Sequence, residues 1–223
     1  MTWVKICGIT NLEDAMTAVG AGADALGFVF YEKSPRKIGP EVVREIVKKV
    51  PENVEKVGVF VDPDWERAVA TAQEAGLSAM QLHFGESSLS ACRALAPATV
   101  KMYVATSAAR LLDHPSGLSK AISLLRSLSV DAVFLDSCTA ELPAGTGETF
   151  DWVSARDMVA CIGRTFQVVI AGGLNPANVA EAMHTLHPWG VDVASGVEAS
   201  PGKKDPAKVR AFIAAVRAAD KID

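Results

Sequence analysis

Two side chains that can move protons stand at the ends of short apolar segments. Cys7 ends the segment 4–7, and Asp136 ends the segment 132–136. A thiol with a lowered pKa can act as a nucleophile or a base, and a partly desolvated aspartate can act as a general acid. Each also has a plainer explanation, since most free cysteines are small buried hydrophobic residues, and a carboxylate can cap a loop or pair with Lys5. As a pair, they predict an isomerase that removes a proton at one position and delivers one at another.

Lys5 precedes Cys7 by two residues, so the two side chains share one face of the predicted strand. Val4 and Ile6 are apolar and are expected to face helices, which turns Lys5 and Cys7 toward the interior. An inward lysine could form a Schiff base with a substrate, or it could form a structural ion pair. We favour an indirect role, because Lys5 would lie one layer deeper than Cys7.

Three turns that contain glycine indicate a phosphate site. They are Gly145-Thr146-Gly147, Gly172-Gly173 and Ser195-Gly196. Such turns expose backbone N–H groups that bind anions, and two of them follow the seventh and eighth predicted strands. Glycine can also simply permit a turn with positive φ, but three such turns on one face of a fold favour an anion site.

Arg36 and His83 are the remaining candidates for contact with a substrate. Arg36 lies in the loop after the second predicted strand, where a guanidinium fork suits a carboxylate, although a solvated loop charge is the more common explanation. His83 follows the fourth strand and could line the same site. The sequence contains no cluster of metal ligands and neither a GxGxxG nor a Walker A motif, so we expect no metal and no cofactor.

Short apolar segments alternate with helical patterns along the chain. The predicted strands are residues 4–7, 25–30, 56–61, 79–82, 100–104, 132–136, 168–171 and 191–194. The predicted helices are residues 11–19, 40–49, 64–74, 87–95, 118–128, 151–159, 175–184 and 206–219, with Asp64, Ser87 and Asn175 as predicted N-caps. Several strands are apolar without alternation, which is typical of parallel strands covered by helices.

Eight strand–helix alternations predict a (β/α)8 TIM barrel that forms one domain over residues 1–223. The alternative is an open, doubly wound sheet. Barrels build active sites at the C-terminal ends of their strands, which is where Cys7, Asp136 and the glycine turns would meet. The long connections 31–39, 105–117 and 137–149 follow strands on that same face.

Composition argues against several classes of function. The net charge of −4 and the pI of about 5.6 do not suit a nucleic-acid surface, and an anionic substrate would have to be held by local groups. The apolar runs are too short to span a membrane, and no signal peptide is apparent. The four cysteines form no CxxC pair, so we expect reduced thiols in a cytoplasmic protein. The oligomeric state is left open.

The chain resembles the phosphoribosylanthranilate isomerase family, barrel enzymes of the tryptophan pathway. The motifs that carry the resemblance appear in family order and are KICGIT (5–10), GFVF (27–30), SPR (34–36), VGVFV (57–61), QLH (81–83), FLD (134–136), GTG (145–147), FDW (150–152), AGGL (171–174), VDV (191–193) and SGVE (195–198). The chain departs from the family pattern at two points. Phe84 separates His83 from Gly85, and Ala144 stands where the family has a further glycine.

The resemblance implies an Amadori rearrangement of N-(5-phosphoribosyl)anthranilate to 1-(2-carboxyphenylamino)-1-deoxyribulose 5-phosphate, without a cofactor. By this likeness Asp136 would protonate the ribose ring oxygen, and Cys7 would remove the C2 proton as a thiolate that Lys5 favours. Arg36 would hold the anthranilate carboxylate, and the glycine turns would hold the phosphate.

Two alternatives to this function remain. One is another sugar-phosphate barrel, such as the related isomerase of the histidine pathway or a bifunctional version. Those families carry an aspartate at the position of Cys7. The other is a barrel that binds a phosphorylated metabolite without catalysis. The thiol argues against the first alternative, and the acid–base pair argues against the second.

Overall fold

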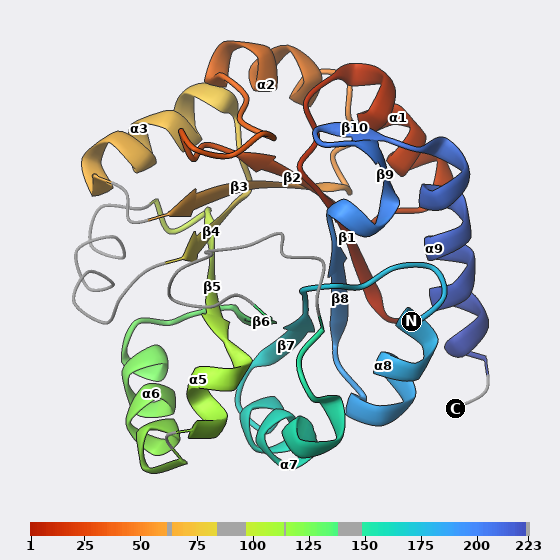
Figure 1. Cartoon of the computed structure of the whole chain (residues 1–223). Coiled ribbons are helices and arrows are strands. Elements are labelled where there is room, and N and C mark those ends of the chain that lie inside the picture. The colour runs from red at the N-terminus through yellow and green to blue at the C-terminus, as the bar shows by residue number, and fades with distance from the viewer. Residues whose placement is uncertain (62–63, 84–96, 114, 138–148, 222–223) are drawn as a thin grey trace.

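Eight parallel strands form a closed barrel in the computed structural model, which describes residues 1–61, 64–83, 97–113, 115–137 and 149–221 (Figure 1). The strands are β1 Trp3–Cys7, β2 Ala25–Val29, β3 Glu55–Val61, β4 Ala79–His83, β5 Lys101–Ser107, β6 Ala132–Asp136, β7 Gln167–Ile170 and β8 Gly190–Val193. β1 pairs with both β2 and β8. The predicted barrel is therefore confirmed, and the open sheet is excluded.

Helices surround the barrel on its outer side (Figure 1). They are α1 Leu12–Ala21, α2 Pro40–Val47, α3 Trp65–Ala75, α5 Ala108–Asp113, α6 Pro115–Ser127, α7 Trp152–Gly163, α8 Val179–Leu186 and α9 Pro206–Ala219. Asp64 caps α3 as predicted, because its side chain accepts a hydrogen bond from the backbone N–H of Arg67 at 2.9 Å. The helix predicted at residues 87–95, with Ser87 as its cap, lies outside the described residues.

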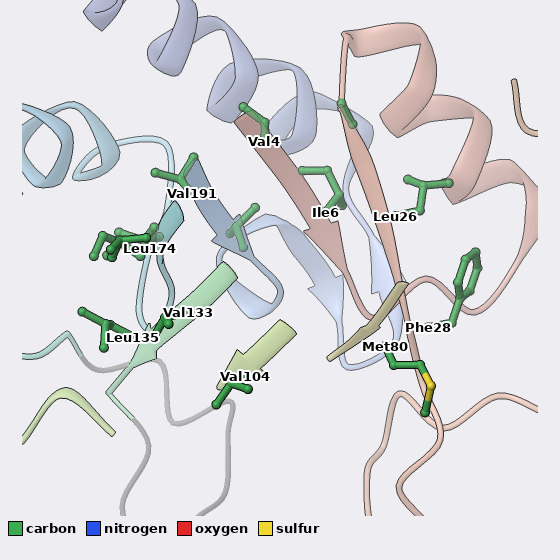
Figure 2. Packing of buried hydrophobic residues seen from close by; sticks show 14 of the residues in the cluster. Val4, Ile6, Leu26, Phe28, Met80, Val104, Val133, Leu135, Leu174 and Val191 are labelled. Atoms are coloured by element: carbon green, nitrogen blue, oxygen red, sulfur yellow. The ribbon is translucent and has the colours of Figure 1, made fainter. Parts of the chain in front are cut away.

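The main hydrophobic core fills the space between the strands and the helices. Val4 and Ile6 on β1 are fully buried there, together with Leu26 and Phe28 on β2 (Figure 2). These positions alternate with inward-facing ones, as the period of two along a strand requires. The predicted orientation of the first strand is therefore confirmed, and Lys5 and Cys7 are left to face the interior of the barrel.

A second cluster, rich in aromatic rings, closes the N-terminal end of the barrel. Trp3 makes edge contacts with the rings of Tyr103 and Phe134, each at a centroid distance of 6.2 Å, and stacks on Trp189 at 5.0 Å. Tyr103 also donates a hydrogen bond to Glu55 at 2.5 Å. Because side chains fill this end, a ligand must enter from the opposite end, where the strands finish.

Two predictions of local structure were wrong. The connection expected at 105–117 is instead the end of β5 followed directly by α5, since Leu111 and Leu112 belong to a helix-forming stretch and pack on the main core. α8 begins at Val179 rather than Asn175. The Asn175 side chain accepts a hydrogen bond from the backbone N–H of Ala177 at 2.9 Å, so it stabilises a turn that precedes the helix.

A small antiparallel hairpin between β8 and α9 was not predicted. The 3-10 turn η1 Ser195–Val197 leads into β9 Glu198–Ser200 and β10 Lys203–Lys204. The hairpin is drawn in blue beside α1 in Figure 1, and ion pairs of Lys203 with Glu13 and Asp14 join it to that helix. Strands of two or three residues are too short to produce a recognisable sequence pattern.

Candidate active site

A cavity of about 410 Å³ opens at the C-terminal ends of the barrel strands. This volume and position are typical of a small-molecule site in a barrel enzyme. Seven of the predicted site residues line it, namely Cys7, Arg36, His83, Asp136, Gly172, Gly173 and Ser195. Gly196 is next to this lining but not part of it, and residues 145–147, like Phe84 and Ala144, lie outside the described residues.

Cys7 is buried at the end of β1, where Gly27 of the neighbouring strand makes room for its sulfur. A Cβ atom at Gly27 would lie 2.8 Å from the sulfur and 2.9 Å from Cε of Lys5. Burial raises the pKa of the Cys7 thiol, and the nearby Lys5 lowers it only in part, so the pKa lies above its ordinary value. Lys5 thus favours the thiolate in the predicted direction but does not outweigh burial in the ligand-free protein.

Lys5 is fully buried and forms an ion pair inside the barrel. Its Nζ donates to both carboxylate oxygens of Asp192 on β8, each at 3.0 Å, and lies 5.3 Å from the centre of the Phe134 ring. Burial alone would lower the pKa of Lys5, but the Asp192 carboxylate and Cys7 together outweigh it and the pKa is raised. An ammonium group held in this way is a poor nucleophile, so the geometry favours the ion pair over the Schiff base.

Asp136 is buried at the end of β6, and Gly172 packs directly against its carboxylate. A Cβ atom at Gly172 would lie 2.7 Å from Oδ1 of Asp136 and would overlap the Ser137 hydroxyl. Gly172 also has φ +80°, a conformation that residues with a side chain rarely adopt. The first glycine of the turn after β7 is therefore required by the position of the carboxylate as well as by the turn itself.

The turns that follow β7 and β8 contact each other at the edge of the cavity. Gly173 has φ +65°, and a Cβ atom at Gly196 would overlap the backbone carbonyl oxygen of Leu174. Only glycine at residue 196 permits this close approach of two backbones. Two of the three predicted glycine turns thus form one continuous backbone surface beside Ser195.

Arg36 is held in place rather than solvated. Its Nε and Nη2 donate to Oε1 and Oε2 of Glu198, each at 2.8 Å, and its side chain is only 13% exposed. A Cβ atom at Gly8 would lie 2.6 Å from Cδ of Arg36, so the aliphatic part of the arginine rests on the residue that follows Cys7. The alternative of a solvated loop charge is therefore wrong.

His83 and Gln81 form a buried polar pair on β4. Nε2 of Gln81 lies 3.1 Å from Nε2 of His83, while Oε1 of Gln81 has no hydrogen-bond partner among the described residues. Burial, with a smaller contribution from Lys5, lowers the pKa of His83 to about 4. His83 is thus a neutral polar group at neutral pH, and the amide nitrogen of Gln81 pairs with it beside a cavity that both residues line.

Four buried polar residues in or beside the cavity were not considered as candidate site residues from the sequence. They are Gln81, Asp192, Glu198 and Lys204. Asp192 and Gln81 carry the same signal that identified Lys5, a polar residue inside an apolar strand, and could have been found by it. Glu198 and Lys204 follow β8 in an irregular segment where no periodic pattern applies.

No group of three or more His, Cys, Asp or Glu side chains is arranged to hold a metal ion within the described part of the chain. Among the same residues, no helix combines the length and apolar character needed to cross a membrane.

Comparisons with known proteins agree on one family. Residues 4–215 match the family described as N-(5'phosphoribosyl)anthranilate (PRA) isomerase. A relative from Citrifermentans bemidjiense, named N-(5'-phosphoribosyl)anthranilate isomerase, is 46% identical over 214 residues, which cover 96% of each chain. The solved structure of phosphoribosyl anthranilate isomerase from Thermotoga maritima is 39% identical, covers 98% of this chain and 100% of its own, and gives a TM-score of 0.83.

A further solved phosphoribosyl anthranilate isomerase contains reduced 1-(o-carboxyphenylamino)-1-deoxyribulose 5-phosphate. It is 38% identical, covers 98% of this chain and 100% of its own, and gives a TM-score of 0.80. The family match and these relatives each span nearly the whole sequence. The chain therefore belongs to the N-(5'-phosphoribosyl)anthranilate isomerase family, whose members are enzymes of tryptophan biosynthesis.

Proposed function

We propose that the chain catalyses the Amadori rearrangement of N-(5'-phosphoribosyl)anthranilate in tryptophan biosynthesis, with Asp136 as general acid and Cys7 as general base. The observation that carries this proposal is that the thiol and the carboxyl group line the same cavity although they come from β1 and β6. A group on each side of one substrate is what proton removal and proton delivery require.

The order of the strands supports an orientation for the substrate. Around the barrel the order is β6, β7, β8, β1, β2. The glycine turns follow β7 and β8, Cys7 ends β1, and Arg36 follows β2, so the thiol lies between two groups suited to anions. The ligand of the related solved structure has a carboxylate at one end and a phosphate at the other. We assign its carboxylate to Arg36 and its phosphate to the glycine turns.

The reaction then proceeds in three steps. Asp136 gives its proton to the ribose ring oxygen, the bond from that oxygen to C1 breaks, and the nitrogen lone pair forms an iminium. The Cys7 thiolate takes the proton from C2, and the electrons of that C–H bond form the enolamine. Tautomerisation of the enolamine moves a proton to C1 and leaves the ketone at C2.

The raised pKa of Cys7 bears on the second step. The thiol is protonated in the ligand-free protein at neutral pH, so the thiolate has to form in the complex with substrate. The Asp136 carboxylate that the first step leaves in the same cavity takes the thiol proton, and the C2 proton then restores the thiol. The positive charge of the iminium lies beside the sulfur and favours its ionisation, in the same sense as the buried Lys5 ammonium. The base is therefore activated by the intermediate that it has to deprotonate.

The purified chain tests this proposal directly. Mixed with freshly made N-(5'-phosphoribosyl)anthranilate, it should remove the anthranilate-type fluorescence in a time course that depends on protein concentration. Product formation would be confirmed by chromatography. Persistent fluorescence, in a sample that binds the phosphorylated ligand, would support the non-catalytic alternative.

A further inference from the structure

We propose that Glu198 is a positioning residue that fixes Arg36 in the orientation needed to receive the substrate carboxylate. This inference rests on the proposed function, which assigns that carboxylate to Arg36. Glu198 lies 162 positions after Arg36 in the chain, and its carboxylate receives both Nε and Nη2 of the guanidinium at 2.8 Å. A bidentate contact of this kind fixes the plane of the guanidinium as well as its position.

The contact leaves part of the arginine for a ligand. Among the described residues the Arg36 side chain donates only to Glu198, through Nε and one N–H of Nη2. Both N–H groups of Nη1 remain, and Arg36 lines the cavity. The edge formed by Nη1 and Nη2 can therefore bind a second carboxylate in the same bidentate manner while the first edge stays on Glu198.

The surroundings of the pair prevent it from moving as a unit. Cδ of Arg36 packs against Gly8, and the backbone N–H of Gly202 donates to Oε1 of Glu198 at 3.3 Å. The hydroxyl group of Thr10 in turn donates to the carbonyl oxygen of Gly202 at 2.5 Å. The loop after β1 thus supports both the arginine and the turn that holds its partner.

Arg36, Glu198 and Lys204 form a cluster of three charged side chains, and Lys204 gives this cluster its net positive charge. Its fully buried Nζ donates to Oε1 of Glu198 at 2.9 Å and to the carbonyl oxygen of Ala194 at 3.1 Å. Burial would raise the pKa of Glu198, but the contacts with Arg36 and Lys204 outweigh it, so Glu198 is ionised at neutral pH. Burial lowers the pKa of Lys204, and the contact with Glu198 offsets this only in part. While Lys204 is protonated, the two cations share one carboxylate and the cluster keeps one net positive charge. A substrate carboxylate would neutralise it.

An arginine that is held in place by a carboxylate loses much of its attraction for a second carboxylate. A single Glu198–Arg36 pair would be neutral and would attract a second anion only weakly. The second cation on Glu198 offsets that loss, because Lys204 supplies the charge that Glu198 removes. The hairpin holds the two side chains together, since Lys204 pairs with Glu198 in the β9–β10 register.

Ligand binding by two variants separates positioning from charge. Glu198→Gln removes the anchor but raises the cluster charge by one unit. Glu198→Gln combined with Lys204→Met also removes the anchor but restores the net charge of the unaltered cluster. The ligands are reduced 1-(o-carboxyphenylamino)-1-deoxyribulose 5-phosphate and the analogue that lacks the carboxyl group, each measured by calorimetry.

We expect both variants to bind the carboxylated ligand at least about tenfold more weakly than the unaltered chain. We expect them to bind the analogue within about twofold, because its phosphate contacts are unchanged. Turnover should show the same effect as a raised KM with a smaller change in kcat. Glu198→Asp, which keeps the charge on a shorter side chain, should recover part of the affinity. Glu13→Gln is the control. It changes an exposed carboxylate that pairs with Lys203 and not with Glu198 or Arg36, so both affinities should stay unchanged.

Three results would overturn the inference. The first is full affinity of the double variant for the carboxylated ligand, which would make net charge sufficient. The second is an equal loss for both ligands, which would indicate general damage to the site. The third is a Glu198→Asp protein that binds both ligands as tightly as the unaltered chain does. This result decides the question even if the Gln variants do not fold. If instead the unaltered chain does not prefer the carboxylated ligand, or Arg36→Met keeps that preference, the assignment of Arg36 under the proposed function has failed.

Discussion

A Cβ atom at Gly172 would lie 2.7 Å from Oδ1 of Asp136, closer than a methyl group and a carboxylate can approach. The turn after β7 therefore packs directly against the Asp136 carboxylate at the end of β6, with no room for a side chain between them. Since Gly172 also has φ +80°, any residue with a side chain would both strain the turn and displace the carboxylate.

Replacing this glycine should impair both catalysis and stability. We expect Gly172→Ala to lower kcat by about 100-fold, because a misplaced general acid loses most of its contribution, and to cost about 1–3 kcal/mol of the free energy of unfolding. Steady-state kinetics and urea unfolding measure the two effects. Gly20→Ala is the matched control, since no described atom beyond its chain neighbours and the backbone of α1 lies within 4 Å of its Cβ position, and it should leave kcat unchanged. A Gly172→Ala protein with normal kcat would show that the carboxylate tolerates displacement.

Removing only one charge of the Lys5–Asp192 pair should strongly destabilise the protein. Lys5→Met leaves the Asp192 carboxylate buried without its cation, and we expect a loss of about 3–5 kcal/mol in the free energy of unfolding. Lys5→Met combined with Asp192→Leu removes both charges and should recover most of that loss. Urea denaturation of the two variants gives the comparison. Equal destabilisation in the single and double variants would mean that packing, rather than the unpaired charge, determines the cost.

His83 should make the protein less stable in acid. Its pKa is lowered from 6.5 to about 4, so between these values the unfolded chain binds a proton that the folded chain does not. Stability therefore falls as the pH decreases through this range, and His83 accounts for about 2 kcal/mol of the fall between pH 8 and pH 5. Unfolding of the unaltered chain and of His83→Asn, each measured at both pH values, gives this contribution as a difference. Parallel pH dependence in the two proteins would contradict a neutral, buried His83.

Much of the fold could be read from the sequence because parallel strands buried on both faces leave a strong pattern. Apolar segments such as the one ending at Cys7 predicted strands at positions close to those observed. The same pattern placed Cys7, His83 and Asp136 at strand ends, and barrel geometry then brought them to one cavity. These predictions depend only on local periodicity and on a closed arrangement of the strands.

The remaining features depend on contacts between distant parts of the chain. The sequence allowed Arg36 to be a solvated loop residue, since its partner Glu198 lies in a hairpin with no periodic pattern. It suggested Lys5 as an inward lysine but could not identify Asp192 on β8 as its partner. Nor could it show that burial outweighs Lys5 at Cys7, because desolvation is a property of the folded environment.

The central claim is that Cys7 and Asp136 act on one bound substrate, and turnover by Cys7→Ala and Asp136→Asn tests it most directly. We predict that each variant loses at least about 100-fold in kcat for N-(5'-phosphoribosyl)anthranilate while its affinity for the reduced product analogue stays within about threefold. Retained affinity shows that the site is intact and that the loss concerns proton transfer. Near-normal turnover in either variant, with the analogue still bound, would contradict the account.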